Sequence, residues 1–156
     1  MTKAGYTGVV FDAEIIQGSS IIMIPLFAKV FAACQAAGLS VVVTVSHSAP
    51  YETDTPQDSI SFMEAWLADS NINAISPQLY SGGEEKSPEF AETATCKNAG
   101  CTWSLYNNSV PKFVPSIVDA GQYAAVQNYF KKKNIKCDGF FQWKQGTSVA
   151  SQSPFL

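Results

Sequence analysis

Two carboxylate side chains, Asp12 and Glu14, stand one residue apart directly after the short apolar run 8–11. Such a run is typical of a buried parallel strand, and side chains two residues apart along a strand point to the same side of the sheet. The carboxyl ends of parallel strands are where ligands bind in α/β proteins. A pair of carboxylates at that place indicates glycoside chemistry or sugar binding. The structural alternative is a solvated pair at the end of a strand.

The composition is that of a globular chain with a lightly charged surface. Its 156 residues are enough for one domain with a single core. Of these residues, 46% are hydrophobic and 15% are charged. The net charge is -3 and there is no arginine, so we expect no nucleic-acid partner. The lysines at 131–133 lie at the end of a predicted helix, where cations suit the helix dipole.

The apolar runs of the sequence indicate whether the chain could cross a membrane, and one short motif bears on its cellular location. The longest apolar stretch, 21–37, is interrupted by Pro25, Lys29 and Gln35, so it falls short of the ~18 residues of a membrane span. We therefore expect no membrane partner. The chain does not open with a signal-peptide pattern, which leaves a cytosolic protein or a mature secreted chain without its leader. The sequon at 107–109 favours an extracellular protein.

Four cysteines are present, at positions 34, 96, 101 and 137. Cys96 and Cys101 flank a turn-prone tetrapeptide, which predicts a small disulfide loop. Zinc is the alternative, but it requires more ligands nearby, and His47 is the only histidine. We therefore expect no metal and no other cofactor.

Apolar runs alternate with helical patterns along the chain. We expect strands at 8–11, 39–45, 72–79, 102–106 and 137–143, and helices from near 25 to 38, then at 59–69, 88–97 and 119–134. Strands joined by crossover helices predict a parallel sheet with right-handed connections. No linker or boundary interrupts this pattern, so residues 1–156 are expected to form one α/β domain.

Polar or aromatic side chains follow every expected strand. In chain order they are Asp12 and Glu14, His47 within the segment 46–51, Gln78 and Tyr80, Tyr106 and Asn107, and Trp143. Aromatic faces stack on sugar rings, while amides and carboxylates bind sugar hydroxyls. The collection therefore predicts a carbohydrate site on one rim of the sheet. For His47, a hydrogen-bonded surface residue is the alternative to a sugar contact.

The order Asp-x-Glu, Gln-x-Tyr and a final Trp resembles the second half of a family-18 glycoside hydrolase of the hevamine (class III chitinase) type. The resemblance implies a partial (β/α)8 barrel, similar to a TIM barrel, with about five βα units. It also implies Glu14 as general acid, Asp12 as the carboxylate that orients a substrate acetamido group, and Tyr80 as a residue that binds this group. Gln78 would contact the sugar, and Trp143 would form the floor of the subsite beside the cleaved bond.

Two departures from the family pattern bear on activity and assembly. Val10 stands where the family has an inner carboxylate, so Asp12 lacks a like-charged partner that would tune its pKa. The first three strands of the barrel have no counterpart. We expect the open inner face to expose apolar side chains such as Val41, Val43 and Ile75, which predicts a homo-oligomer.

Three functions compete on these observations. The favoured one is a lectin for N-acetylhexosamines or chitin oligomers that is catalytically weak or inactive. The alternative is a trimmed chitinase that hydrolyses β-1,4-linked N-acetylglucosamine by substrate assistance, with Glu14 and Asp12 as its catalytic residues. A structural fragment without a ligand is the third. Val10 and the missing half-barrel disfavour efficient catalysis, which needs a preorganised, water-excluding site, whereas the retained polar and aromatic residues disfavour a purely structural role.

Overall fold

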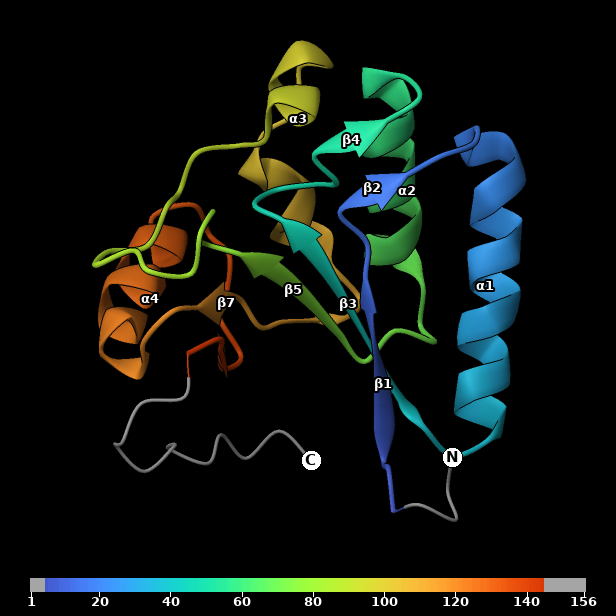
Figure 1. Cartoon of the computed structure of the whole chain (residues 1–156), viewed down its shortest axis with the longest axis horizontal. Helices are drawn as coiled ribbons and strands as arrows, with labels where there is room; N and C mark the ends of the chain where they lie inside the picture. The colour runs from blue at the N-terminus through green and yellow to red at the C-terminus, as the bar shows by residue number, and fades with distance from the viewer. Residues whose placement is uncertain (1–4, 145–156) are drawn as a thin grey trace.

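A parallel sheet curled into a half-barrel organises residues 5–144, the part of the chain that the computed structural model describes (Figure 1). The strand order is β1-β3-β5-β7-β8, with β6 beside β5, and every pair is parallel. The strands are β1 (Gly8–Asp12), β3 (Ser40–Ser46), β5 (Ala74–Gln78), β6 (Lys112–Phe113), β7 (Ser116–Ile117) and β8 (Phe141–Gln142). The expected α/β class and parallel sheet are confirmed.

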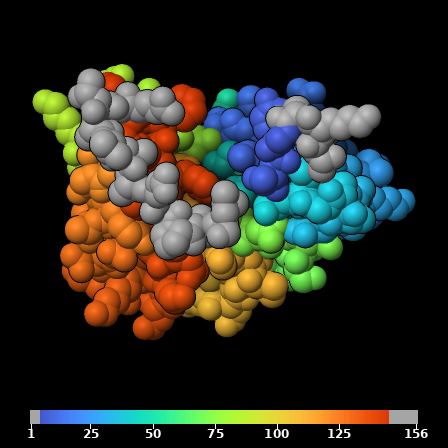
Figure 2. Space-filling model, turned by 90° about the horizontal axis from the view of Figure 1, so that it is seen from below, coloured from blue at the N-terminus to red at the C-terminus, as the bar shows by residue number. Residues whose placement is uncertain are grey.

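Helices connect the strands and cover the outer face of the sheet. They are α1 (Ser20–Ala36), α2 (Pro56–Ala68), α3 (Ala94–Asn98) and α4 (Tyr123–Lys131), with the 3-10 helices η2 (Trp103–Asn108) and η3 (Ala120–Gln122). A second, two-stranded sheet pairs β2 (Ile15–Ile16) with β4 (Glu52–Thr53). Figure 2 shows α1, in blue, and α4, in orange, on opposite sides of the molecule, which agrees with the order of the strands in the sheet.

The first two helices begin where the sequence offers capping side chains. The Ser19 side chain accepts a hydrogen bond from the Ile21 N–H at the start of α1. The Thr55 side chain does the same for the Asp58 N–H, with Pro56 in the first turn of α2. Gly38 follows α1 with a φ of 75°, a left-handed conformation that favours glycine. These local signals set the connections between β1, β3 and β5.

The helix-covered face of the sheet is apolar. Val41, Val43 and Ile75 are fully buried and belong to the same core cluster as Phe62, Met63 and Trp66 of α2. The expectation that these three aliphatic side chains lie open inside a barrel is wrong. Phe11 is in register with Val43, and its ring packs against Phe31 of α1 at 5.1 Å. This alternate set of residues therefore points towards the helices.

The concave face carries the other alternate residues, which combine hydroxyl side chains with the aliphatic Val10 and Val42. The Thr44 hydroxyl donates to the carbonyl oxygen of Ser76 at 2.7 Å, and the Ser76 and Ser116 hydroxyl oxygens are 2.8 Å apart. Val10, on the same face of β1, has an exposed fraction of 65%. The hydroxyl groups of this face are therefore hydrogen-bonded within the sheet.

Two predicted elements in the second half of the chain are wrong. Residues 102–106 form the start of η2, not a strand, because Trp103 and Tyr106 both pack into the core, and side chains three residues apart share a face in a 3-10 helix. The helix predicted from residue 88 is absent up to residue 93, and α3 begins at Ala94. The fourth position in the sheet belongs to β6 and β7, and the fifth strand is confined to Phe141–Gln142.

The predicted disulfide loop is confirmed, since Cys96 and Cys101 are bonded across the end of α3. Cys34 and Cys137 are free thiols, and burial raises the pKa of the Cys137 thiol to about 12. Within residues 5–144, no helix combines the length and the hydrophobicity that crossing a bilayer requires.

Candidate functional site

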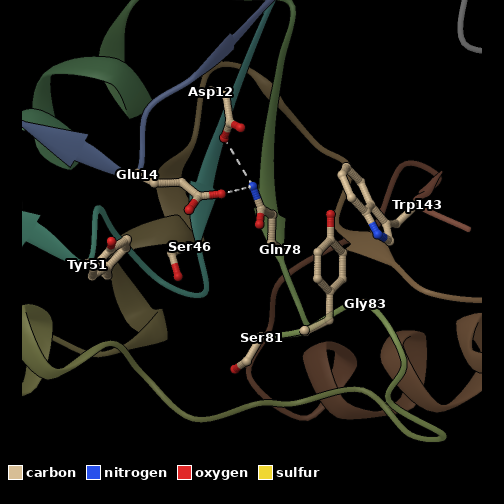
Figure 3. A pocket seen from close by; sticks show the side chains of 10 residues that line it. Asp12, Glu14, Ser46, Tyr51, Gln78, Ser81, Gly83 and Trp143 are labelled. Atoms are coloured by element: carbon tan, nitrogen blue, oxygen red, sulfur yellow. Dashed lines mark hydrogen bonds between the residues drawn. The ribbon is translucent and has the colours of Figure 1, made fainter.

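An open pocket of about 430 Å³ lies at the carboxyl ends of the strands (Figure 3). Its lining brings together residues from β1, β3, β5 and the segments that follow them and β8. They are Asp12, Glu14, Ser46, Tyr51, Gln78, Tyr80, Ser81, Gly82, Gly83 and Trp143. The pocket volume lies within the range of about 300–1,000 Å³ that is common for small-molecule sites.

The two carboxylates at the top of the pocket share one amide donor. The Gln78 Nε2 group donates to Asp12 Oδ1 at 3.1 Å and to Glu14 Oε1 at 2.7 Å. Gln78 reaches both because Thr44 lies opposite Asp12, and Ser46 lies opposite Gln78, on the intervening strand β3. The predicted convergence of the first and third strand ends therefore takes the form of a hydrogen-bonded triad.

The environment of Asp12 disfavours its charged form. Burial raises its pKa above the ordinary value, the negative charge of Glu14 raises it further, and the hydrogen bond from Gln78 opposes both effects. Asp12 therefore keeps its proton to a higher pH than an ordinary aspartate. The expectation that Asp12 lacks a like-charged partner is wrong, because Glu14, two residues along the chain, supplies this repulsion in place of a carboxylate at position 10.

An aromatic wall of Tyr80 and Trp143 faces these carboxylates. The two ring centroids are 5.8 Å apart with an interplanar angle of 31°. Tyr80 has an exposed fraction of 8%, whereas Trp143 has one of 64%. Burial, together with the charges of Asp12 and Glu14, raises the pKa of Tyr80 to about 12. Its phenol is therefore a hydrogen-bond donor at neutral pH, and the Trp143 ring is free to meet a ligand.

A short loop after β5 holds Trp143 in place. A Cβ atom on Gly83, whose φ is 80°, would lie 2.5 Å from Trp143 Nε1, so the indole rests directly on the Gly83 backbone. Lys144, the next residue after the tryptophan, pairs with Glu84. The Glu85 carboxylate accepts from the Ser81 N–H at 3.0 Å. The loop and the aromatic wall therefore form one unit.

Three residues that the sequence placed on the rim lie outside the pocket lining. His47 has a φ of 47°, and its Nε2 lies 3.2 Å from Glu89 Oε2, an oxygen that also accepts from the Ser81 hydroxyl at 2.6 Å. The buried Tyr106 donates its hydroxyl to the Ser48 carbonyl at 2.9 Å. Asn107 is exposed on η2. His47 and Tyr106 hold the loops beside the pocket.

The pocket also contains residues that sequence reasoning did not select. Ser46 and Tyr51 belong to the segment 46–51, from which we chose His47, while Ser81 and Gly83 follow Tyr80 directly. The sequence feature that could have identified Tyr51 is its position after Pro50 at the end of an expected strand. For Gly83 the only such feature is the pair Gly82-Gly83 beside the expected rim.

Comparisons with family models, with curated protein sequences and with solved structures return no match for this chain. Within residues 5–144, no group of three or more histidine, cysteine, aspartate or glutamate side chains is arranged to hold a metal ion. The chemistry of the pocket is therefore argued from its carboxylates, its amide and its aromatic rings.

Proposed function

We propose that the protein is a lectin that recognises N-acetylhexosamines or chitin oligomers at the carboxyl ends of its parallel strands. One observation carries the proposal: a tilted pair of adjacent aromatic rings, Tyr80 and Trp143, lines the same open pocket as the amide-bridged carboxylates Asp12 and Glu14. Aromatic faces bind the apolar side of a sugar ring, and carboxylate and phenol groups bind its hydroxyl and amide groups.

Weak or absent catalysis forms part of the proposal. The Gln78 amide donates to Glu14 Oε1, so this oxygen, which a general acid would use towards the leaving group, is already engaged by the protein. Val10, two residues before Asp12 on the same face of β1, supplies no second carboxylate. The pocket is open to solvent, so it lacks the water exclusion that strengthens electrostatic catalysis.

A trimmed chitinase is the second candidate, and the raised pKa of Asp12 favours it. A protonated Asp12 would donate to the acetamido group of a substrate, while Glu14 would act as general acid. A relationship to hevamine-type family-18 glycoside hydrolases, with a partial TIM barrel, is proposed with it. The carboxyl-end positions of the Asp-x-Glu and Gln-x-Tyr motifs on neighbouring parallel strands support that relationship.

An extracellular location is also a proposal. The Cys96–Cys101 disulfide supports it, since disulfides persist mainly in oxidising compartments. The sequon at Asn107 supports it as well, because Asn107 is exposed on η2 and glycosylation requires an accessible asparagine.

Self-association through α1 is proposed in place of an interface at the sheet core. Ile22, Leu26 and Val30, with exposed fractions of 65%, 49% and 45%, are spaced four residues apart and form one ridge on α1. Among the strands of residues 5–144, β1 is the edge strand of the sheet and pairs only with β3. Figure 1 shows α1 at the same end of the molecule as β1. Identical ridges pack well across a two-fold axis. Light scattering at micromolar concentration tests this, and a monomer at all concentrations contradicts it.

Calorimetry with N-acetylglucosamine and its oligomers tests the lectin function. We expect measurable binding, and we expect Trp143→Ala to weaken it by about 1–2 kcal/mol through loss of a stacking surface. No affinity in the unmutated protein for any of these sugars would overturn the proposal. Hydrolysis of chitin oligomers on the order of one turnover per second or more, abolished in Glu14→Gln, would establish the chitinase instead.

A further inference from the structure

Tyr51 is an aromatic residue of the pocket with no assigned role, and we propose that it is a second stacking platform. The inference rests on the proposed function. It states that the pocket binds two consecutive N-acetylated sugar residues, one on Trp143 and the other on Tyr51, and so selects a disaccharide over a single sugar.

The position of Tyr51 in the pocket is the first argument. It lines the pocket and has an exposed fraction of 46%. Figure 3 shows Tyr51 on one side of the Glu14–Gln78 hydrogen bond, with Tyr80 and Trp143 on the other side. A ligand that contacts both aromatic groups must therefore pass over the polar centre of the site.

The backbone at Tyr51 is held firmly, which separates it from an ordinary surface tyrosine. Its N–H donates to the Glu14 carbonyl at 2.9 Å, directly before the parallel pairing of Ile15 with Glu52 in the small β2–β4 sheet. One short sheet therefore positions both Glu14 and Tyr51. A platform fixed before the ligand arrives loses little conformational freedom on binding.

The preceding residue is tied to two helices. The Pro50 carbonyl accepts hydrogen bonds from the Ser59 hydroxyl of α2 at 3.0 Å and from the Thr95 hydroxyl of α3 at 2.7 Å. The Cys96–Cys101 disulfide closes the turn at the end of α3. The segment that presents Tyr51 is consequently part of the framework of the domain.

The chemistry between the two platforms suits a pair of linked sugars. Each sugar ring has an apolar face that stacks on an aromatic ring and a polar edge that forms hydrogen bonds. The polar residues Ser46, Ser81 and Glu14 belong to the same lining. A pocket of about 430 Å³ has the capacity for a ligand larger than one sugar.

The test compares N-acetylglucosamine with N,N′-diacetylchitobiose by calorimetry on the full chain. We expect the disaccharide to bind about tenfold more tightly than the monosaccharide. Tyr51→Ala should weaken disaccharide binding about three- to tenfold and change monosaccharide binding by less than about twofold, while Tyr51→Phe retains the preference. Tyr6→Ala is the matched control, because Tyr6 has an exposed fraction of 64% and does not line the pocket.

Each other result has a definite meaning. Equal affinities for the two sugars, or a Tyr51→Ala variant that loses both equally or neither, would overturn the second platform and leave the lectin function standing. Failure of the native protein to bind either sugar would overturn the lectin function and the second platform together. Unchanged circular dichroism and an unchanged unfolding midpoint in Tyr51→Ala show that the segment keeps its fold in the variant that tests the platform.

Discussion

The two faces of the parallel sheet are built from alternate residues of the same strands, and they serve different ends. On the helix-covered face, Val43 and Ile75 are fully buried in the core. On the concave face, Thr44 and Ser76 form a polar row that leads to Gln78 and the pocket. A shift of one residue along a strand therefore separates a position that stabilises the fold from one that shapes the site.

The framework and the site also differ in their carboxylates, because the pKa values of Asp58 and Asp12 shift in opposite directions. Asp58, at the start of α2, accepts from the Ser20 N–H at 2.8 Å and from the Thr55 hydroxyl at 2.6 Å, and its pKa is lowered to about 2. The pKa of Asp12, at the pocket, is raised by burial and by Glu14. The framework stabilises the charged form of its carboxylate, whereas the site disfavours it, as is common where function sets the environment.

The largest effect is expected when a substitution on the helix-covered face of the sheet is compared with one on the concave face. Ile75→Ala removes a fully buried side chain and should lower the free energy of unfolding by about 2–5 kcal/mol. Val10→Ala, on the concave face and 65% exposed, should change it by about 0.5 kcal/mol or less. Urea unfolding measures both. Equal losses in the two variants would mean that the faces do not differ as described.

The pH dependence of stability should have opposite signs at the two carboxylates. Asp58 has a lowered pKa, so its contribution is present above its ordinary value of 3.8 and is lost as the pH falls towards about 2. Asp58→Asn should remove this loss and cost on the order of 1–2 kcal/mol at pH 7.

Asp12 provides the opposite case for the same measurement. Its raised pKa favours folding below its ordinary value of 3.8, and this contribution is lost as the pH rises through the raised pKa. Asp12→Asn should therefore flatten the decline of stability on that side. Urea unfolding from pH 2 to pH 7 measures both variants, and slopes of the same sign would refute the distinction between them.

Removal of the shared amide donor should affect the pocket face alone. Gln78→Leu leaves Asp12 and Glu14 without the donor that bridges them, so the pKa of Asp12 should rise further. Affinity for N-acetylglucosamine should fall about tenfold, equivalent to 1.4 kcal/mol. NMR titration and calorimetry measure the two effects. Gln57→Leu, at an exposed position on α2, is the control and should leave both unchanged.

The smallest effect concerns the loop that supports Trp143. Gly83→Ala places a methyl group 2.5 Å from the indole nitrogen, so Trp143 must move, and affinity for the sugar should fall about threefold. Gly82→Ala is the matched control, since its added Cβ would meet only Glu85 at 3.4 Å. Iodide quenching reports Trp143, because Trp66 and Trp103 are buried. Identical quenching in both variants would contradict the support role.

The sequence by itself determined the first half of the fold and the centre of the site. Continuous apolar runs predicted the strands β1, β3 and β5, and helical spacing predicted the helices between them. The start of α1 was predicted near Pro25, but the helix begins at Ser20, where Ser19 caps it. Asp12, Glu14, Gln78 and Tyr80 followed from those strands. Alternation along each strand and the common direction of parallel strands place these side chains on one rim.

Only the tertiary structure decided the rest, because long-range contacts overrode local preference. Two-residue strands such as β6 and β7 carry no period, and the β-forming residues at 102–106 became η2 when Trp103 and Tyr106 packed into the core. Local pattern also could not say which face of β3 meets the helices. Nor could it place Gly83 beneath Trp143, a contact between residues 60 positions apart in the chain, since only the closed fold brings them together.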